Sequence, residues 1–150
     1  MPVRVSIQRA CKDPAPLRGQ LIRWVRRALA GHRRDAELML RLVDDAESAE
    51  LNARWRQRKG PTNVLSFPAG EMPENLRDFL GDIVICSPLV AREAAAQRKL
   101  PEAHWAHLVI HGTLHLLGFD HVKPREAAIM EDTERRIMSS LGYPDPYQES

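Results

Sequence analysis

A chain of 150 residues, of which 43% are hydrophobic and 28% are charged, is typical of one soluble domain that can bury a core. Its net charge of +2 is small, but arginines and lysines gather in two runs, 23–34 and 54–59, that would suit a polyanion. Because no stretch approaches the ~18 apolar residues of a membrane span and the N-terminus lacks a secretory signal, we expect one cytoplasmic domain over residues 1–150 without membrane contact.

The first half of the chain alternates strand and helix patterns. Residues 3–7 alternate apolar and polar side chains as a half-buried strand does, and apolar residues recur at helical spacing over 17–29. Residues 36–43 place three leucines on one face of a second strand. Asp44 or Asp45 then offers an N-cap to the next helix, so the expected order is β-α-β-α.

The second half begins with two strands and continues with helices. Residues 63–67 predict a short strand that Pro68 stops, and residues 80–86, which follow a polar loop over 69–78, predict a buried strand in the centre of the sheet. Three helices follow, each with a proline at its start: 87–99, one that begins at Pro101 and carries histidines, and one from Pro124 to residue 141.

The helix that begins at Pro101 carries a histidine pattern that ordinary packing does not explain. His111 and His115 are four residues apart, so their rings share one helix face. Gly118 can take the left-handed conformation that ends a helix, which allows His121 to return toward the same point. A single histidine on an apolar face is more often a core residue, but three at this spacing favour a catalytic site. We therefore predict one Zn²⁺ held by His111, His115 and His121, with a fourth position open to water.

The same spacing argues against a peptidase. His-x3-His-x2-Gly-x2-His is the ligand spacing of the metzincin proteases, whose motif has a glutamate directly after the first histidine as the general base. Gly112 stands at that position here. A metallopeptidase or amidohydrolase that uses the same three ligands needs a base from elsewhere, and it stays an alternative on that condition.

Two further stretches complete a recognisable signature. They are Leu-Asn-Ala-Arg-Trp-Arg at 51–56, which leads to Pro-Thr-Asn-Val-Leu-Ser-Phe-Pro at 61–68, and Leu-Gly-Asp-Ile-Val-Ile-Cys at 80–86. Together with the histidine string at 111–121 they resemble the YbeY family, small bacterial metal-dependent endoribonucleases that act on single-stranded RNA. The resemblance implies an α+β fold, a single domain with a four-stranded mixed sheet and about five helices packed on it. It also implies a role in ribosomal RNA maturation, at the 3′ end of 16S RNA, and in ribosome quality control.

The resemblance also assigns the site. It implies zinc at the three histidines and makes Arg56 the basic residue of the active cleft, where a planar guanidinium can bind phosphate oxygens through two hydrogen bonds. We accordingly assign catalytic roles to Arg56 and His111. Many relatives carry an aspartate near Lys59 and Gly60, and this chain does not.

Four more residues are candidates for contacts around the metal or the substrate. Asp120 could accept the second ring N–H of a ligand, as carboxylates beside metal sites commonly do, or only cap its turn. His107 lies one turn before the first ligand, too far for the same ion, so we expect it behind the ligands or toward RNA, and His104 on the surface. Thr62 and Ser66 could line the cleft with hydroxyl groups, although both are also ordinary residues for a strand edge.

The expected reaction is metal-assisted cleavage of an RNA phosphodiester bond. The zinc ion either activates a water or polarises the phosphate, while Arg56 stabilises charge on the non-bridging oxygens. The expected partners are single-stranded RNA, ribosomal RNA in particular, and the ribosome or proteins of its small subunit; the sequence does not define the oligomeric state. With only 5% aromatic residues, we expect no stacking platform and little sequence preference.

The alternative without enzymatic activity is a ribosome-associated protein with a structural zinc. Structural zinc sites usually have four protein ligands and often include cysteine. Neither Cys11 nor Cys86 is close to the histidines in sequence, so this alternative is disfavoured.

Overall fold

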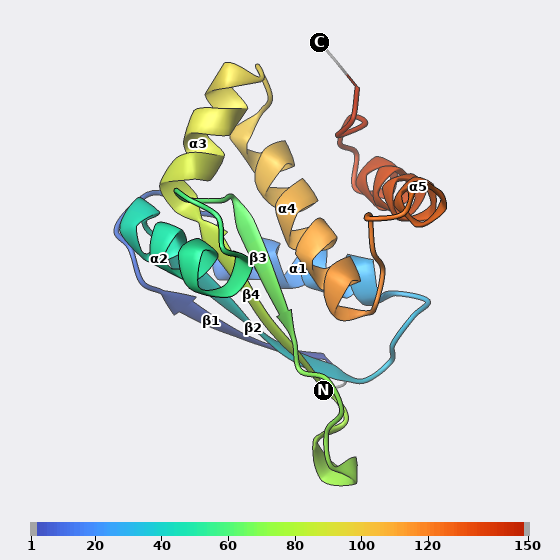
Figure 1. Ribbon diagram of the computed structural model, residues 1–150. Coiled ribbons are helices and arrows are strands. Elements are labelled where there is room, and N and C mark those ends of the chain that lie inside the picture. Colours follow the sequence, from blue (N-terminus) through green and yellow to red (C-terminus); the bar gives the residue numbers. More distant parts are fainter. Residues whose placement is uncertain (1–2, 149–150) are drawn as a thin grey trace.

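The strand with alternating leucines lies inside a mixed sheet. In the computed structural model, which describes residues 3–148, β2 (Ala36–Val43) pairs in parallel with β1 (Val3–Arg9) and with β4 (Phe79–Cys86). β3 (Val64–Pro68) pairs antiparallel with β4, so the described strands form one four-stranded sheet in the order β1-β2-β4-β3 (Figure 1). The expected α+β fold is confirmed, and β4 is central, as its apolar sequence predicted.

Five α-helices accompany this sheet in the described part of the chain: α1 (Arg18–Leu29), α2 (Asp45–Arg56), α3 (Ser87–Ala96), α4 (Pro101–Leu116) and α5 (Pro124–Ser140). Asp44 caps α2, because its side chain accepts a hydrogen bond of 2.9 Å from the backbone N–H of Glu47. α3 ends earlier than expected because Arg98 takes a left-handed conformation, with φ at 54°, that no helix can continue.

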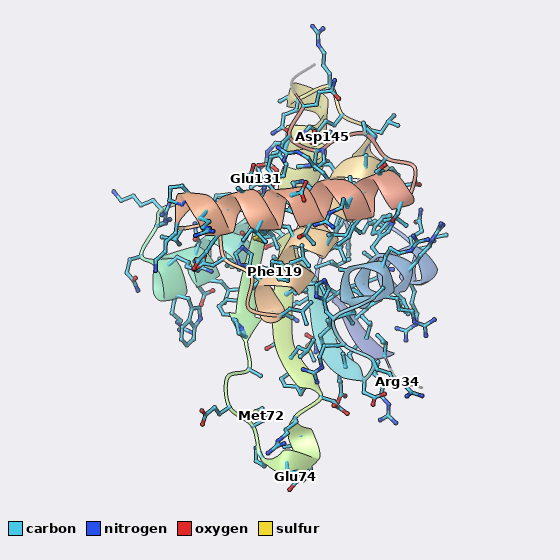
Figure 2. All side chains as sticks on the ribbon, turned by 90° about the vertical axis from the view of Figure 1, so that its right-hand side faces the viewer. Arg34, Met72, Glu74, Phe119, Glu131 and Asp145 are labelled. Atoms are coloured by element: carbon cyan, nitrogen blue, oxygen red, sulfur yellow. The ribbon has the colours of Figure 1, made fainter. Side chains whose placement is uncertain are left out.

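The main core lies between one face of the sheet and the helices α1 and α4 (Figure 1). Side chains with at most 2% exposure fill it, among them Trp24, Leu38, Leu40, Ile83, Ile110 and Leu114. α5 packs on α4 and crosses the near side of the molecule in Figure 2, where it buries Met130 and Met138. α4 therefore has the sheet on one side and α5 on the other, and its side chains meet different neighbours on each.

A smaller apolar cluster lies on the opposite face of the sheet, against α2. Because successive side chains of a strand point to opposite faces, Val84 joins this cluster while Ile83 joins the main core. The connection between β3 and β4, which carries Met72 and Glu74, extends away from the rest of the molecule (Figures 1 and 2). Among the described residues, no helix combines the length and the apolar character needed to cross a membrane.

Gly81 marks a close approach between the two strands next to the site. Its φ of 135° lies in a region that glycine adopts far more readily than other residues. A Cβ at this position would lie 2.2 Å from the carbonyl oxygen of Phe67 and 3.0 Å from the backbone nitrogen of Ala69. The pairing of β4 with the end of β3 therefore requires glycine at position 81.

This requirement can be tested by substitution. We expect Gly81→Ala to lower the free energy of unfolding by more than about 1 kcal/mol, because the backbone must shift to remove both the clash and the unfavourable φ. Gly19→Ala in α1 is the matched control: nothing beyond its own turn of helix lies within 4 Å of the added Cβ, so it should be neutral or stabilising by up to about 1 kcal/mol. Urea denaturation measures both changes, and equal midpoints for the two variants would contradict the assignment.

Candidate metal centre

The first two histidines of the motif are brought to the sheet by a glycine between them. Gly112 is buried, and a Cβ there would lie 2.8 Å from Cγ2 of Ile83 and 3.3 Å from Oγ of Ser66. The hydroxyl of Ser66 also donates a hydrogen bond of 3.2 Å to the carbonyl oxygen of Gly112. Position 112 therefore faces the sheet. Any side chain in this position would press against Ile83, so the close approach of the helix to the sheet requires glycine here.

The three histidines converge at the end of α4. The Nε2 atoms of His111 and His115 are 3.2 Å apart, and Nδ1 of His121 lies 3.0 Å from Nε2 of His115. Gly118, with φ at 103°, reverses the chain after α4 and brings His121 back. A tetrahedral zinc with Zn–N bonds of about 2.0–2.1 Å would hold its ligand nitrogens about 3.3–3.4 Å apart. These three nitrogens could therefore hold one ion of that size.

The protonation state of His115 suits a metal ligand. Burial, together with the neighbouring rings of His111 and His121, lowers the pKa of His115 to about 4. A neutral imidazole keeps a lone pair on the nitrogen that faces the other two ligands. His111 and His115 are half-buried and His121 is exposed, so the cluster is open to solvent on one side.

A buried glutamate from α5 fixes the orientation of the His111 ring. Glu134 has no exposed surface, and it accepts hydrogen bonds from His107, from Nδ1 of His111 at 3.1 Å and from the hydroxyl of Tyr147 at 2.8 Å. Burial alone would raise the pKa of this carboxyl, but the hydrogen bonds from the two histidines outweigh burial and lower the pKa to about 2. The ionised carboxylate keeps the proton of His111 on Nδ1, which leaves the lone pair of Nε2 for a metal.

The sequence did not identify Glu134, and it offered Asp120 for a similar role. Oδ1 of Asp120 accepts hydrogen bonds from the backbone N–H groups of His121 and Val122 at 2.7 and 3.3 Å, so it caps the turn before the third ligand. A signal for Glu134 was present: it stands between Met130 and Met138, four residues from each, in the middle of the apolar stripe of α5. An acidic residue in such a stripe needs a buried partner.

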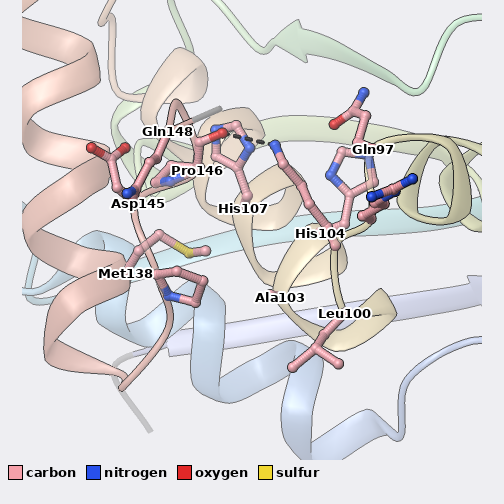
Figure 3. Close-up of a pocket in the computed structure, with 12 residues that line it drawn as sticks. Gln97, Leu100, Ala103, His104, His107, Met138, Asp145, Pro146 and Gln148 are labelled. Atoms are coloured by element: carbon pink, nitrogen blue, oxygen red, sulfur yellow. Dashed lines mark hydrogen bonds between the residues drawn. The ribbon is translucent and has the colours of Figure 1, made fainter. Parts of the chain in front are cut away.

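The other two histidines of α4 lie behind the ligands. The ring of His107 meets Glu134 instead of the three ligand nitrogens. The expectation that His104 lies on the surface was wrong: it is 5% exposed, and its Nε2 lies 2.8 Å from a carboxylate oxygen of Glu93 on α3. Both rings line a cavity of about 250 Å³ between α4 and the C-terminal segment, which also contributes Pro146 (Figure 3). This cavity is separate from the cleft that contains the ligands.

The three converging histidines form one wall of a polar cleft of about 290 Å³. The facing wall is the end of α2 with the loop after it, so the cleft brings together His111, His115, His121, Asn52, Arg56, Arg58, Thr62, Asn63, Val64, Leu65 and Ser66. Arg56, Thr62 and Ser66, all expected near the site, line it. Of the described residues that line this cleft, none is a carboxylate.

Two buried polar residues of α2 hold the loop that carries this wall. The side-chain amide of Asn52 donates a hydrogen bond of 2.9 Å to the carbonyl oxygen of Gly60. The hydroxyl of Ser48 donates to the carbonyl oxygen of Thr62 and accepts from its backbone N–H, at 2.9 and 3.0 Å. Gln57 ends α2 in a left-handed conformation, with φ at 53°. The position of Arg56 opposite the histidines is therefore fixed by hydrogen bonds on both sides of the turn.

Comparison with known proteins places these features in one family of sequences. The family model described as Endoribonuclease YbeY matches residues 10–142. The chain is 52% identical over 149 residues to a protein named Endoribonuclease YbeY from Stutzerimonas stutzeri, covering 98% of this chain and 92% of that one. It is 49% identical over 152 residues to the protein of the same name from Nitrosococcus oceani, covering 99% of each. The solution structure of TM1509 from Thermotoga maritima has the same fold, with a TM-score of 0.60 at 24% identity over 96% of this chain and 99% of that one.

The role of Glu134 leads to a prediction about metal affinity. Glu134→Gln keeps the shape of the side chain but removes the charge that holds the proton of His111 on Nδ1, so we expect divalent metal to bind about 10–100-fold more weakly. His115→Ala, which removes one of the three imidazole nitrogens, should lose most of the bound metal. Its metal affinity is the reference for loss of the site, against which the affinity of Glu134→Gln is compared. Calorimetric titration of metal into each purified variant gives the affinities.

The matched control for Glu134→Gln is Glu131→Gln, one turn earlier on α5, where the carboxylate is partly exposed and lies 3.7 Å from Arg135. It should bind metal like the unmodified protein. Unchanged affinity in Glu134→Gln, with an unchanged fold, would show that the carboxylate does not orient the ligand.

Proposed function

The chain belongs to the YbeY family of endoribonucleases, and from that premise we propose that it cleaves single-stranded RNA at one zinc ion held by His111, His115 and His121. As a member of this family it is a metal-dependent hydrolase that acts on RNA phosphodiester bonds. We further propose ribosomal RNA as the substrate, with the 3′ end of 16S RNA and the quality control of ribosomes as the cellular context. That role would place the protein in the cytoplasm, beside the small ribosomal subunit and its proteins.

One observation carries the proposal: three converging imidazole nitrogens and the guanidinium of Arg56 line the same cleft. The nitrogens would hold the ion, and the arginine would meet a phosphate placed against it. The absence of a carboxylate from the cleft, among the described residues, removes the support for a peptidase or amidohydrolase, which would need a base there. A structural zinc is disfavoured because three ligands leave one side of the cluster open to solvent.

A bound Zn²⁺ would supply Lewis acidity at the scissile phosphate or would lower the pKa of a water. The rest of the chemistry falls to residues of the chain. Arg56 can donate two parallel hydrogen bonds to non-bridging oxygens and so stabilise the charge that develops there. Within residues 3–148, no carboxylate forms an ion pair with Arg56, so its guanidinium is available to a phosphate. His111 contributes as a ligand whose orientation Glu134 fixes.

The contribution of Arg56 can be measured directly. We expect Arg56→Ala to reduce kcat for RNA cleavage by about 10²–10³-fold, the usual loss when one group that stabilises transition-state charge is removed. Arg56→Lys should recover only part of the activity, because an ammonium cannot make the bidentate contact. Steady-state cleavage of a fluorescently labelled single-stranded RNA measures both effects.

Arg18→Ala is the control for the Arg56 variants, since Arg18 is exposed at the start of α1 and does not line the cleft. It should change kcat by less than about threefold, within the range of surface substitutions. Metal content and melting temperature should be unchanged in all three variants. A collapsed thermal transition in Arg56→Ala would instead make Arg56 a structural residue.

The shape of the cleft predicts the strand state of the substrate. A flexible single strand can bend toward histidines at a helix end, whereas an A-form duplex is stiff and presents its phosphates on a convex surface. We expect single-stranded RNA to be cleaved at least about tenfold faster than a perfect duplex of the same sequence, and we expect a chelator to abolish both reactions. Binding should weaken linearly with the logarithm of salt concentration, with a slope of about −0.7 per phosphate contacted. Equal rates on the two substrates, or activity that survives the chelator, would contradict the proposed function.

A further inference from the structure

The last turn of α2 carries an aromatic side chain that the core does not need. Trp55 is 58% exposed, whereas the other two tryptophans, Trp24 and Trp105, are 2% and 4% exposed. Its ring meets that of the half-buried Phe67 edge to face, with centroids 6.1 Å apart and planes at 73°. Phe67 packs against the small apolar cluster between α2 and the sheet, so one edge of the indole contacts a partly buried ring. More than half of Trp55 stays exposed to solvent.

Both residues of the aromatic pair lie next to the cleft that contains the three histidines. Trp55 directly precedes Arg56 on α2, and Phe67 directly follows Ser66 on β3, and both of those neighbours line the cleft. Successive side chains of a strand point to opposite faces, so Ser66 faces α4 while Phe67 faces α2. Because β3 is the edge strand of the sheet, a chain that leaves the cleft can pass over this edge and reach the indole.

The surface around the pair is positively charged and its charges are unpaired. Arg54, Arg56, Arg58 and Lys59 are all exposed, and none of them forms an ion pair with a carboxylate of residues 3–148. Proteins that bind single-stranded nucleic acid combine such a cationic path, which follows the phosphates, with aromatic side chains on which bases stack. Both components are present here within one turn of helix and the loop after it.

We propose that Trp55, supported by Phe67, is the stacking site for a nucleobase of the RNA strand whose phosphate lies in the metal cleft. The inference rests on the proposed function, because it takes RNA as the occupant of that cleft. Stacking tolerates any base, since every base has a π-face, so the site would add affinity without strong sequence preference. The low aromatic content had led us to expect no stacking platform, and two of these few aromatic residues provide one beside the cleft.

Tryptophan fluorescence offers a direct test with the metal-loaded full-length protein. The probe is a short 2′-O-methyl oligoadenylate, which resists cleavage, and its comparison is an abasic strand of the same length, which keeps the phosphates but has no bases. Because Trp24 and Trp105 are buried, quenching by the oligonucleotide reports Trp55. We expect quenching with the base-containing strand and none with the abasic strand.

Substitution separates stacking from packing. Trp55→Leu should abolish the quenching and weaken binding of the base-containing strand about tenfold, as measured by anisotropy of a labelled oligonucleotide, while binding of the abasic strand stays the same. Trp55→Phe keeps a ring and should bind nearly as well as the unmodified protein, so it tests the idea even if Trp55→Leu proves unstable. Leu76→Ala removes an exposed apolar side chain (46% exposed) on the connection between β3 and β4, and it should have no effect.

Catalysis distinguishes failure of this inference from failure of the proposed function. In Trp55→Leu we expect KM for single-stranded RNA to rise about tenfold while kcat and metal content stay unchanged, because a base contact away from the phosphate adds mainly ground-state binding. Equal quenching by the abasic strand, or unchanged binding in Trp55→Leu, would overturn the stacking site alone. Absence of RNA cleavage by the unmodified protein would overturn the proposed function instead.

Discussion

The close contact of α4 with the sheet at Gly112 is the constraint on which the site depends. Without a side chain at this position, the helix backbone rests against Ile83 and accepts a hydrogen bond from Ser66. That contact sets the distance between the histidines of α4 and the edge strand β3, so it also sets the width of the cleft. Any larger residue would separate the helix from the sheet, because a packed interior has few voids that could absorb the added volume.

The second constraint is the buried carboxylate of Glu134, which ties the fold to the chemistry. An ionised carboxylate without exposed surface is costly unless hydrogen bonds satisfy it, and here three donors from α4 and the C-terminal segment do so. The same bonds dock α5 on α4 and fix the ring of His111. Stability and ligand geometry therefore depend on one residue, and a change that loosens α5 would also loosen the metal centre.

The sequence predicted what local periodicity encodes and missed what tertiary packing decides. Four strands, five helices and the His111–His115–His121 set follow from spacings within one element or one turn. Glu134 could not be paired with His111 from the sequence, because the two residues meet only when α5 packs on α4. The error on His104 has the same origin, since its partner Glu93 comes from another helix. The exposure of Trp55 was equally hidden, because tryptophan side chains are on average highly buried.

The composition of the cleft limits how protons can move in it. The three histidines would be engaged as ligands, and a guanidinium donates hydrogen bonds but accepts none. The remaining polar groups that line the cleft, from Asn52, Thr62, Asn63 and Ser66, are amides and hydroxyls that do not accept a proton at neutral pH. With no carboxylate among the described lining residues, no side chain is placed to act as a general base. Water or the substrate itself must then carry the proton. The protein contributes positioning and stabilisation of charge. A polyanionic substrate with its own hydroxyl groups can use both contributions, and a peptide cannot.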